Sequence, residues 1–442
     1  MREAETFTVA ETSFPNAKSR NALLIAYKAF ADLAGKGSLF VITIVAARRL
    51  SPESFGVFSL GSTLGWMLAV VSDFGIQLHL ARAVARRPAE SSRLLRDWLR
   101  VRLWTAAGAA ALVGIGVAAG RSAASAEPIA ILAVVYACTG LVELLHYFYR
   151  GLSRSDVESA LTLWQRGGTL VCALIALAWK PDVTTLALAM MFPVVVTLAA
   201  SVRIARGLAD GPRSSSRGDR GELPLRSSAD NADCSWPVFR RDVWPIGAGI
   251  VLSALYFRID VFLVQIWSGT EAVARYNAVF RLVEALRLFP AAVLAVVLPS
   301  LVRAGDLRPL ARVAVPVTAF AIAVGAALWM SAGWLIPLVY GAPYASAVPA
   351  FRILLLSFPL LSLNYALTHQ LVGWDGQRAY LAICAIALAV NVGINARLIP
   401  LWSIDGAAWA TFLTEVVITA GCCVALWITR SAAHAGQLVA EA

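Results

Sequence analysis

AARRLSPESFGVFSLGSTLGWMLAVVSDFGIQLHLARAVARR (residues 46–87) contains the two signals that decide the fold of this chain. A continuous apolar run covers 55–79, and arginines follow it at Arg82, Arg86 and Arg87. An α-helix needs about 20 mostly apolar residues to cross the roughly 30 Å of hydrocarbon in a bilayer. Because the run is long enough and does not alternate between apolar and polar residues, it predicts a membrane-spanning helix rather than a barrel strand.

The rest of the chain repeats this pattern. The 442 residues are 59% hydrophobic and only 15% charged, whereas a soluble domain carries about 25% charged residues. We therefore expect an all-α integral membrane protein with about 12 transmembrane helices, and we exclude a water-soluble enzyme. The predicted spans are 22–47, 55–79, 101–119, 128–149, 159–179, 183–204, 243–267, 273–302, 310–337, 347–371, 377–399 and 404–429.

The positive charges lie mainly on one side of the predicted membrane. The 80–102 connection holds seven arginines and the 203–241 connection holds eight, whereas the connections 122–127, 267–270 and 340–347 hold no Lys or Arg. Lys and Arg accumulate in cytoplasmic connections, so both termini are predicted to be cytoplasmic. The net charge of +11 thus reflects membrane topology, and we expect no nucleic-acid partner.

A polar segment divides the chain into two halves. Residues 207–241 are rich in Ser, Gly, Pro and charges of both signs, which is typical of a flexible cytoplasmic linker. Its basic content leaves binding to acidic lipid headgroups open as an alternative. The predicted organisation is an N-terminal tail (1–21), a six-helix lobe (22–206), the linker (207–241), a second six-helix lobe (242–430) and a C-terminal tail (431–442).

A short internal repeat supports the two halves. SPESFGVF (51–58) precedes the second span and GTEAVARY (269–276) precedes the eighth, which aligns Glu53 with Glu271 at an offset of 218 residues. Repeats with an even number of helices keep the same orientation in the membrane. They are therefore related by an axis along the membrane normal.

Charges inside the predicted spans form two stripes with surplus positive charge. A charge at the bilayer centre costs about 2.5–3.5 kcal/mol, so such residues usually face a cavity or a partner. Each stripe has two cations and one acid at helical spacing, and the stripes lie on the first and the eighth span. Their residues are Lys28, Asp32 and Lys36, and Arg281, Glu284 and Arg287.

Three further charges complete the candidate site. The seventh span carries Arg258 and Asp260, which point in different directions and need separate partners, and the fifth carries Arg166. A surplus of buried cations favours an anion, and arginine and lysine suit phosphate oxygens. The candidate phosphate-binding residues are Lys28, Lys36, Arg166, Arg258, Arg281 and Arg287. The candidate gating or ion-coupling residues are Asp32, Asp260 and Glu284. Structural pairing between helices is the alternative for all nine.

Other residue types point to no further chemistry. The six cysteines and four histidines show no metal-ligand spacing, so the sequence predicts no metal, cofactor or catalytic residue. Several tryptophans lie near span ends, where interfacial belts form, and stacking on sugar rings is the alternative role. They are Trp66, Trp98, Trp104, Trp179, Trp267 and Trp334.

Four segments in the same order carry a family resemblance. Residues 46–87, 256–301, 340–351 and 390–415 resemble polysaccharide and O-antigen flippases of the multidrug/oligosaccharidyl-lipid/polysaccharide exporter superfamily. The resemblance covers nearly the whole chain. It implies two six-helix bundles in a V-shaped molecule that alternates between inward-open and outward-open states. It also implies that basic residues on the first and eighth helices line the cavity.

The resemblance further implies a substrate and a location. The expected cargo is an undecaprenyl-pyrophosphate-linked oligosaccharide, carried across the inner membrane for lipopolysaccharide or exopolysaccharide synthesis. Membrane lipids, a polysaccharide polymerase and glycosyltransferases are the expected partners. Asp32 and Glu284 depart from a purely basic lining.

Three other classes of membrane protein have features that can be compared with this sequence. A major-facilitator transporter should carry a glycine- and acid-containing loop after its second span, and ARAVARRPAESS (81–92) lacks it. A membrane enzyme such as a polymerase or ligase needs a large outer loop, which the predicted topology does not provide. A cation-coupled multidrug exporter of the same superfamily stays open as the alternative, because Asp32 or Asp260 could serve it.

Overall fold

The computed structural model describes residues 15–119, 123–210, 243–303, 307–374 and 376–441, and these residues form helices and short connections without any strand. The N-terminal lobe begins at Pro15, inside the predicted tail, and α7 ends four residues inside the predicted linker. The remaining linker residues from 211 lie outside the described residues. The helices of this lobe are α1 (Pro15–Arg49), α2 (Pro52–Asp73), α3 (Ile76–Arg86), η1 (Pro88–Glu90), α4 (Ser91–Ala119), α5 (Ala123–Gly151), α6 (Ser155–Trp179) and α7 (Val183–Asp210).

The C-terminal lobe has the same number of predicted spans. Its last helix continues to Glu441, so most of the predicted C-terminal tail is helical. The elements are α9 (Trp244–Ser268), α10 (Thr270–Leu286), α11 (Leu288–Arg303), α12 (Arg308–Tyr340), η3 (Ala342–Ala347), α13 (Val348–Gly373) and α14 (Gln377–Glu441).

Helix α2 ends at Asp73, before the end of the predicted second span (55–79), because the chain turns at residues 74 and 75. Phe74 and Gly75 both have positive φ (44° and 81°). The Asp73 carboxylate accepts hydrogen bonds from the backbone N–H groups of Gly75 and Gln77, which caps the start of α3. Because hydropathy averaged over about 20 residues does not show such a turn, the predicted span 55–79 includes both the end of α2 and the start of α3.

The predicted eighth span is broken into α10 and α11 at Arg287. Pro290 lacks an N–H and its ring clashes with the carbonyl four residues earlier, which is Leu286. The break places the Arg287 backbone between two helix ends. It lies at the centre of the site described below.

The long element α14 contains two predicted spans, 377–399 and 404–429. Ser403 has a non-helical conformation (φ 49°, ψ −125°). A Cβ added at Gly406 would lie 2.3 Å from the Leu398 carbonyl oxygen, so the chain folds back on itself here. The element α14 therefore contains two helices, in agreement with the two predicted spans.

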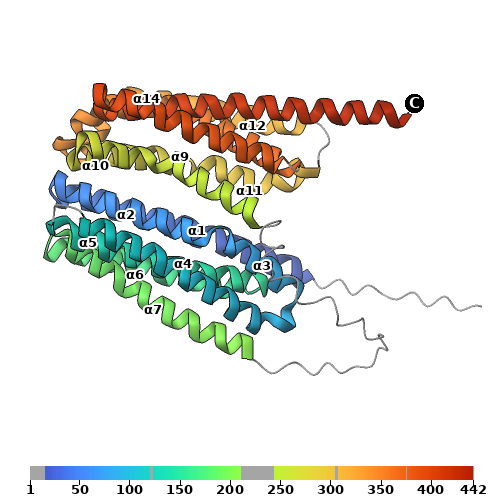
Figure 1. Cartoon of the computed structure of the whole chain (residues 1–442), viewed down its shortest axis with the longest axis horizontal. Coiled ribbons are helices and arrows are strands. Elements are labelled where there is room, and N and C mark those ends of the chain that lie inside the picture. Colours follow the sequence, from blue (N-terminus) through green and yellow to red (C-terminus); the bar gives the residue numbers. More distant parts are fainter. Residues whose placement is uncertain (1–14, 120–122, 211–242, 304–306, 375, 442) are drawn as a thin grey trace, which may run out of the picture.

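The two lobes lie side by side with their helices roughly parallel (Figure 1). Leu50, in the connection between α1 and α2, lies at one end of the molecule, and Phe74, in the connection between α2 and α3, lies at the other. These ends are called the Leu50 end and the Phe74 end below. The lobes meet where α2 packs on α9 and α10, and where α1 packs on α10 and α12.

One hydrophobic core joins both lobes at the Leu50 end. It contains Leu50 and Phe55 of the N-terminal lobe together with Tyr276 and Tyr344 of the C-terminal lobe. Toward the Phe74 end the cores are separate, one within each lobe. The lobes therefore share one apolar core at the Leu50 end, whereas at the Phe74 end they meet through a smaller contact in which the ring centroids of Phe74 and Trp244 lie 5.1 Å apart.

Two glycines allow α2 to approach the second lobe closely. A Cβ at Gly56 would lie 2.1 Å from the Thr270 carbonyl oxygen, and a Cβ at Gly247 would lie 2.3 Å from the Phe74 carbonyl oxygen. The first contact joins the two segments of the internal repeat, so the repeated helix starts meet at the lobe interface.

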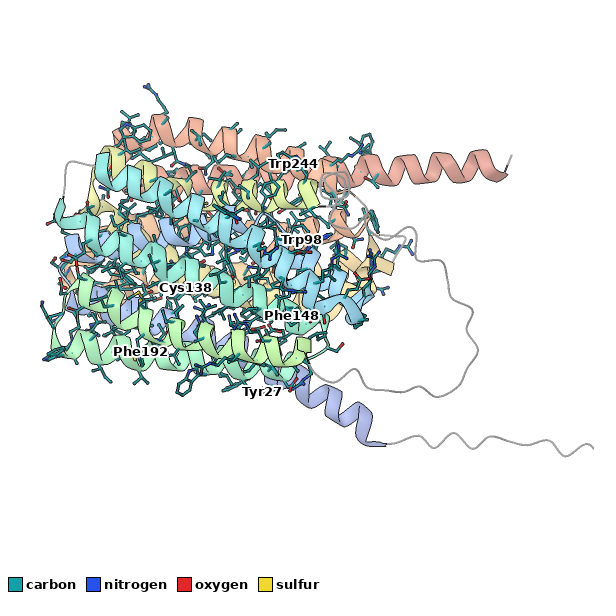
Figure 2. The ribbon with its side chains drawn as sticks, turned by 60° about the horizontal axis from the view of Figure 1, so that its bottom comes forward. Tyr27, Trp98, Cys138, Phe148, Phe192 and Trp244 are labelled. Carbon is teal, nitrogen blue, oxygen red and sulfur yellow. The ribbon has the colours of Figure 1, made fainter. Side chains whose placement is uncertain are left out.

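The described helices suit a membrane by length and composition. Nine of them are long and apolar enough to cross one, and α14 among these contains two spans. Apolar side chains also cover the outer surface: Phe192 is 67% exposed, whereas Phe148 is fully buried (both labelled in Figure 2). The prediction of an all-α, multi-pass membrane protein with two helical bundles is confirmed.

Candidate functional site

A cavity of about 340 Å³ lies between the lobes and carries a surplus of positive charge. Its N-terminal wall is a stretch of α1 around Lys36, and its C-terminal wall is the α10–α11 break with Arg281, Glu284 and Arg287. Three of the four charged lining residues are cations. The complete lining is Lys36, Gly37, Leu39, Phe40, Thr43, Arg281, Glu284, Ala285, Arg287, Leu288, Ala291 and Tyr365.

Glu284 is shared by two arginines. Its Oε2 atom accepts a hydrogen bond of 2.7 Å from Arg281 Nη1 and another of 2.7 Å from Arg258 Nη2. Arg258 is 3% exposed; it also donates to Asn277 and lies over the Phe280 ring at 4.6 Å. One carboxylate thus balances two guanidinium groups, and the three residues together keep one positive charge.

Lys36 and Arg287 add to this surplus. Neither forms an ion pair with another described residue, and the Arg287 guanidinium lies over the Phe257 ring at 4.3 Å. They line the same cavity and come from opposite lobes. Such a set of cations, in a cavity with little competing negative charge, can hold a phosphate or pyrophosphate through charge-assisted hydrogen bonds.

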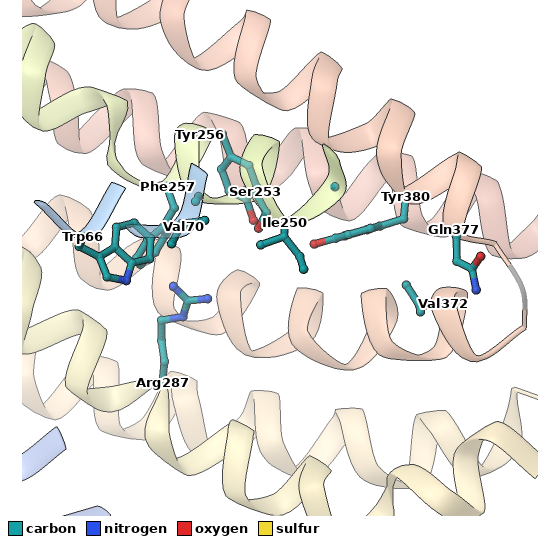
Figure 3. Close-up of a pocket in the computed structure, with 12 residues that line it drawn as sticks. Trp66, Val70, Ile250, Ser253, Tyr256, Phe257, Arg287, Val372, Gln377 and Tyr380 are labelled. Atoms are coloured by element: carbon teal, nitrogen blue, oxygen red, sulfur yellow. The ribbon is translucent and has the colours of Figure 1, made fainter. Parts of the chain in front are cut away.

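A second cavity of about 450 Å³ shares Arg287 with the first. It lies between α2 of one lobe and α9, α13 and α14 of the other. Figure 3 shows the Arg287 side chain rising toward it, with Trp66 and Phe257 on one side and Tyr380 on the other. The lining is mostly apolar and aromatic. Arg287 therefore stands where a cationic cavity and an aromatic cavity meet.

Asp260 lies outside both cavities. It is 2% exposed, it accepts a hydrogen bond from the Tyr276 hydroxyl, and its own chain neighbour Val261 donates its N–H to it. The Tyr276 hydroxyl also lies 3.2 Å from Thr411 Oγ1 of α14. Arg258 and Asp260 therefore have separate partners, as their spacing in the sequence predicts.

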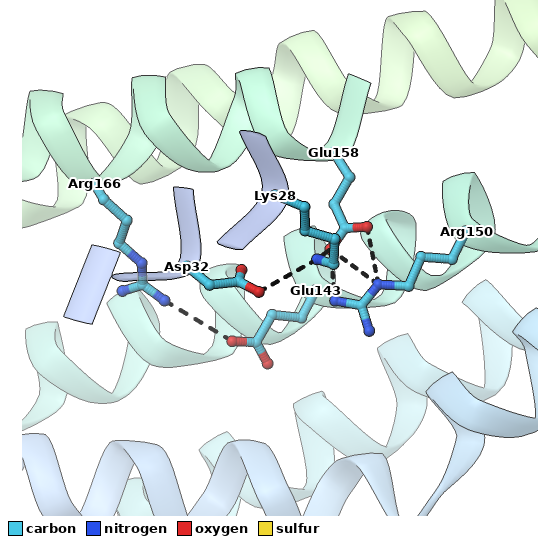
Figure 4. Close-up of polar contacts among 6 residues, drawn as sticks. All are labelled: Lys28, Asp32, Glu143, Arg150, Glu158 and Arg166. Carbon is cyan, nitrogen blue, oxygen red and sulfur yellow. Dashed lines mark hydrogen bonds and ion pairs between the residues drawn. The ribbon is translucent and has the colours of Figure 1, made fainter. Parts of the chain in front are cut away.

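The remaining predicted residues form a charge network within the N-terminal lobe (Figure 4). Glu158 is its centre: Lys28 donates to it at 2.7 Å, and Arg150 donates through two nitrogens at 2.5–2.9 Å. Lys28 also lies 3.5 Å from Asp32. The structure thus keeps Lys28 and Asp32 away from the lining of the two interlobe cavities.

Arg166 belongs to the same lobe. Its guanidinium lies 4.0 Å from Glu143, and a Cβ added at Gly35 would lie 3.1 Å from its Cγ atom, so the side chain packs across α1. It lines a small cavity inside the N-terminal lobe rather than the interlobe site. Of the six predicted cations, the interlobe cavity brings together Lys36, Arg281 and Arg287, with Arg258 buried behind Glu284.

A family model described as "Polysaccharide biosynthesis protein" matches residues 25–304, which is more than half of the chain. The chain belongs to this family. The resemblance found in the sequence is therefore confirmed. No match was found among curated proteins.

Solved transporters of the MOP superfamily have the same fold as this chain. A MATE-family multidrug resistance transporter in an inward-facing conformation matches with a TM-score of 0.66 at 14% identity, covering 92% of this chain and 98% of its own. The lipid II flippase MurJ, in an inward closed conformation, matches with a TM-score of 0.68 at 11% identity over 92% and 87% of the two chains. A MOP superfamily transporter from Pyrococcus furiosus matches with a TM-score of 0.58 at 14% identity over 92% of this chain and 95% of its own.

Two features of the site were not predicted from the sequence. The first is Glu158, whose carboxylate holds two cations although this residue precedes the predicted fifth span. Glu158 follows Arg150 by eight residues in the sequence. This spacing does not indicate an ion pair unless the turn between α5 and α6 is known.

The tryptophans differ from the predicted belt in two cases. Trp104, Trp179, Trp267 and Trp334 are 42–84% exposed, as expected for belt residues. Trp98 is buried against His79, and Trp66 lines the aromatic cavity. Trp66 shares a face of α2 with Val70 and Gly56, and this face meets the other lobe. The position of Trp66 on this face of α2 is the feature from which its place at the interlobe cavity could have been predicted.

Replacing Glu158 by glutamine is expected to lower the free energy of unfolding by about 2 kcal/mol, because Lys28 and Arg150 would lose their shared buried carboxylate. The expected loss is below that of a fully buried pair since the two cations are 28% and 37% exposed. Thermal unfolding of the purified protein in detergent measures it. Asp156→Asn, which breaks an exposed pair with Arg154, is the control and should change stability by less than about 0.5 kcal/mol. Equal effects of the two substitutions would contradict a structural role for the network.

Proposed function

We propose that this protein is a flippase that carries a polyprenyl-pyrophosphate-linked oligosaccharide from the cytoplasmic to the outer leaflet of the inner membrane. The observation that carries the proposal is the interlobe cavity, whose lining contains the three cations Lys36, Arg281 and Arg287 and only one carboxylate, Glu284, among its described residues. A pyrophosphate crossing hydrocarbon needs such compensation, because an uncompensated charge there is costly. The family and the flippase and exporter folds of the structural neighbours are consistent with transport rather than catalysis.

The charge distribution gives the proposed orientation. With both termini cytoplasmic, the Phe74 end carries the arginine-rich connection 80–102 and faces the cytoplasm. The apolar core that joins the lobes then closes the outer side, and on the cytoplasmic side the lobes have separate cores and meet through Phe74 and Trp244. In an alternating-access cycle the two lobes rock about a site near the midplane. The segment 207–241 serves as the linker between the lobes.

A cation-coupled multidrug exporter is the alternative within the same fold. It would need free acidic groups in the cavity to attract an organic cation. Glu284 is held by two arginines, and Asp260 is buried away from the lining. The cavity would therefore repel a cation, which favours the anionic lipid.

The test is to deplete the protein in cells and follow the precursor. Lipid-linked glycan should accumulate on the cytoplasmic leaflet, and surface lipopolysaccharide or exopolysaccharide should fall. Re-expression of the wild-type chain should restore both. A precursor distribution and a surface polysaccharide level that do not change would refute the proposal. A polymerase and glycosyltransferases acting on the same glycan are the expected partners.

A further inference from the structure

The aromatic cavity, of about 450 Å³, is a feature that the phosphate chemistry leaves unexplained. Its lining contains four aromatic rings, a short aliphatic surface and a few polar groups (Figure 3). Arg287 is the one charged group among the described residues that line it. The rings belong to Trp66, Tyr256, Phe257 and Tyr380, and the polar groups include Ser253, Gln377 and the two tyrosine hydroxyls.

This combination of groups suits a sugar better than a second phosphate. A sugar ring presents a face of C–H groups that packs on an aromatic ring, and an edge of hydroxyls that needs donors and acceptors. Trp66 and Phe257 supply ring faces, whereas Ser253, Gln377 and Tyr380 supply hydrogen-bonding groups. A second phosphate would find a single guanidinium there, which the first cavity already uses.

The shared arginine fixes the order of the ligand's parts. Arg287 lines both cavities, so a pyrophosphate held by Lys36 and Arg287 lies directly beside the aromatic cavity. The group that enters the aromatic cavity is then one bonded to the pyrophosphate. In a lipid-linked oligosaccharide the pyrophosphate is bonded to two groups, the first sugar of the glycan and the polyprenyl tail, and the polar groups of the cavity favour the sugar.

We propose that the aromatic cavity is a glycan subsite that selects an uncharged first sugar. This inference rests on the proposed flippase function and makes its substrate class narrower. A sugar that carries a carboxylate would place a second negative charge in a cavity whose only cation, among the described lining residues, is engaged by phosphate. An uncharged hexose avoids this repulsion and gains contact with Trp66.

A polyprenyl tail is the competing occupant of an aromatic cavity. Ser253 and Tyr380 already hydrogen-bond to each other, but a tail would cover Gln377 and the Tyr256 hydroxyl without offering them a hydrogen bond, and burying such groups unpaired is unfavourable. The observations therefore favour the sugar. The experiment below separates the two occupants.

The experiment measures the binding of three short-chain probes to the purified full-length protein in detergent. The probes are a prenyl pyrophosphate, the same compound carrying one neutral hexose, and the same compound carrying a uronic acid. The neutral-hexose probe should bind about tenfold more tightly than the bare pyrophosphate, which is the contribution expected from stacking and one or two hydrogen bonds. The uronic-acid probe should show no such gain.

Substitutions in the aromatic cavity test whether the higher affinity for the neutral-hexose probe comes from this subsite. Trp66→Ala should abolish the tenfold preference while leaving the affinity for the bare pyrophosphate within about twofold. Tyr380→Phe, which keeps the ring and removes the hydroxyl, should reduce the preference and serves if Trp66→Ala is unstable. Trp104→Ala is the matched control, since Trp104 is a tryptophan on α4 with 79% of its surface exposed. It should change nothing.

The outcomes distinguish the subsite from the proposed function. Binding of the pyrophosphate probes without any preference for the hexose would overturn the subsite alone. A Trp66→Ala variant that weakens the bare and the glycosylated probe equally would also overturn it, in favour of the tail. If none of the three probes binds the wild-type protein, the proposed flippase function itself fails.

Discussion

Alanine in place of Arg287 is expected to weaken the binding of a polyprenyl pyrophosphate by about 10- to 100-fold, the loss of one or two charge-assisted hydrogen bonds. Transport should fall at least as far, because Arg287 lines both cavities. The Arg287 guanidinium lies over Phe257 and has no ion-pair partner among the described residues. Its removal therefore breaks no ion pair among the described residues, and the protein should keep its expression level and its thermal stability.

Complementation of a strain that lacks the protein measures this prediction. Lys36→Ala should give a comparable loss from the opposite wall of the cavity, since Lys36 also has no ion-pair partner among the described residues. Arg287→Lys should restore part of the activity, because lysine keeps the charge but loses the planar fork. Arg154→Ala is the control, as this arginine pairs with Asp156 at an exposed turn. Full complementation by both cavity variants would assign the charged stripes a purely structural role.

The fold could be predicted from the sequence because a membrane imposes its thickness on every helix. Continuous apolar runs gave the number and type of helices, and arginine-rich connections gave the expected orientation. The helix breaks at Phe74 and Arg287 were missed. Their local causes, Gly75 and Pro290, are visible in the sequence, but an average over 20 residues conceals them.

The site could be predicted only in part, because a stripe on one helix does not reveal what faces it. Lys28 and Lys36 share a stripe of α1, yet Lys28 meets Glu158 of α6 within its own lobe, whereas Lys36 reaches the interlobe cavity. The spacing of Arg281 and Glu284 correctly indicated a pair, but the second arginine on Glu284, Arg258, comes from another helix. Contacts between helices decide which cation is paired.

The substitution of Glu284, whose carboxylate pairs with two arginines, is the second one expected to have a large effect. Glu284→Gln should lower the free energy of unfolding by about 2–3 kcal/mol, because Arg258 and Arg281 lose their shared carboxylate and Arg258 is 3% exposed. The same change should raise the affinity for pyrophosphate by about tenfold, since the anion no longer competes with Glu284 for the Arg281 guanidinium. Tighter binding in the loading state slows release, so transport should fall although the ligand binds better.

These opposite changes separate a cavity acid from a merely structural one. Thermal unfolding with and without pyrophosphate measures both, because a ligand stabilises the folded state in proportion to its affinity and concentration. The stabilisation by pyrophosphate should therefore be larger in Glu284→Gln than in the wild-type protein. Glu143→Gln is the control, since Glu143 is 48% exposed and lies 4.0 Å from Arg166 in the N-terminal lobe. If Glu284→Gln loses stability without gaining affinity, then Arg258 and Arg281 serve only to bind Glu284, and Lys36 and Arg287 alone are left to hold the phosphate.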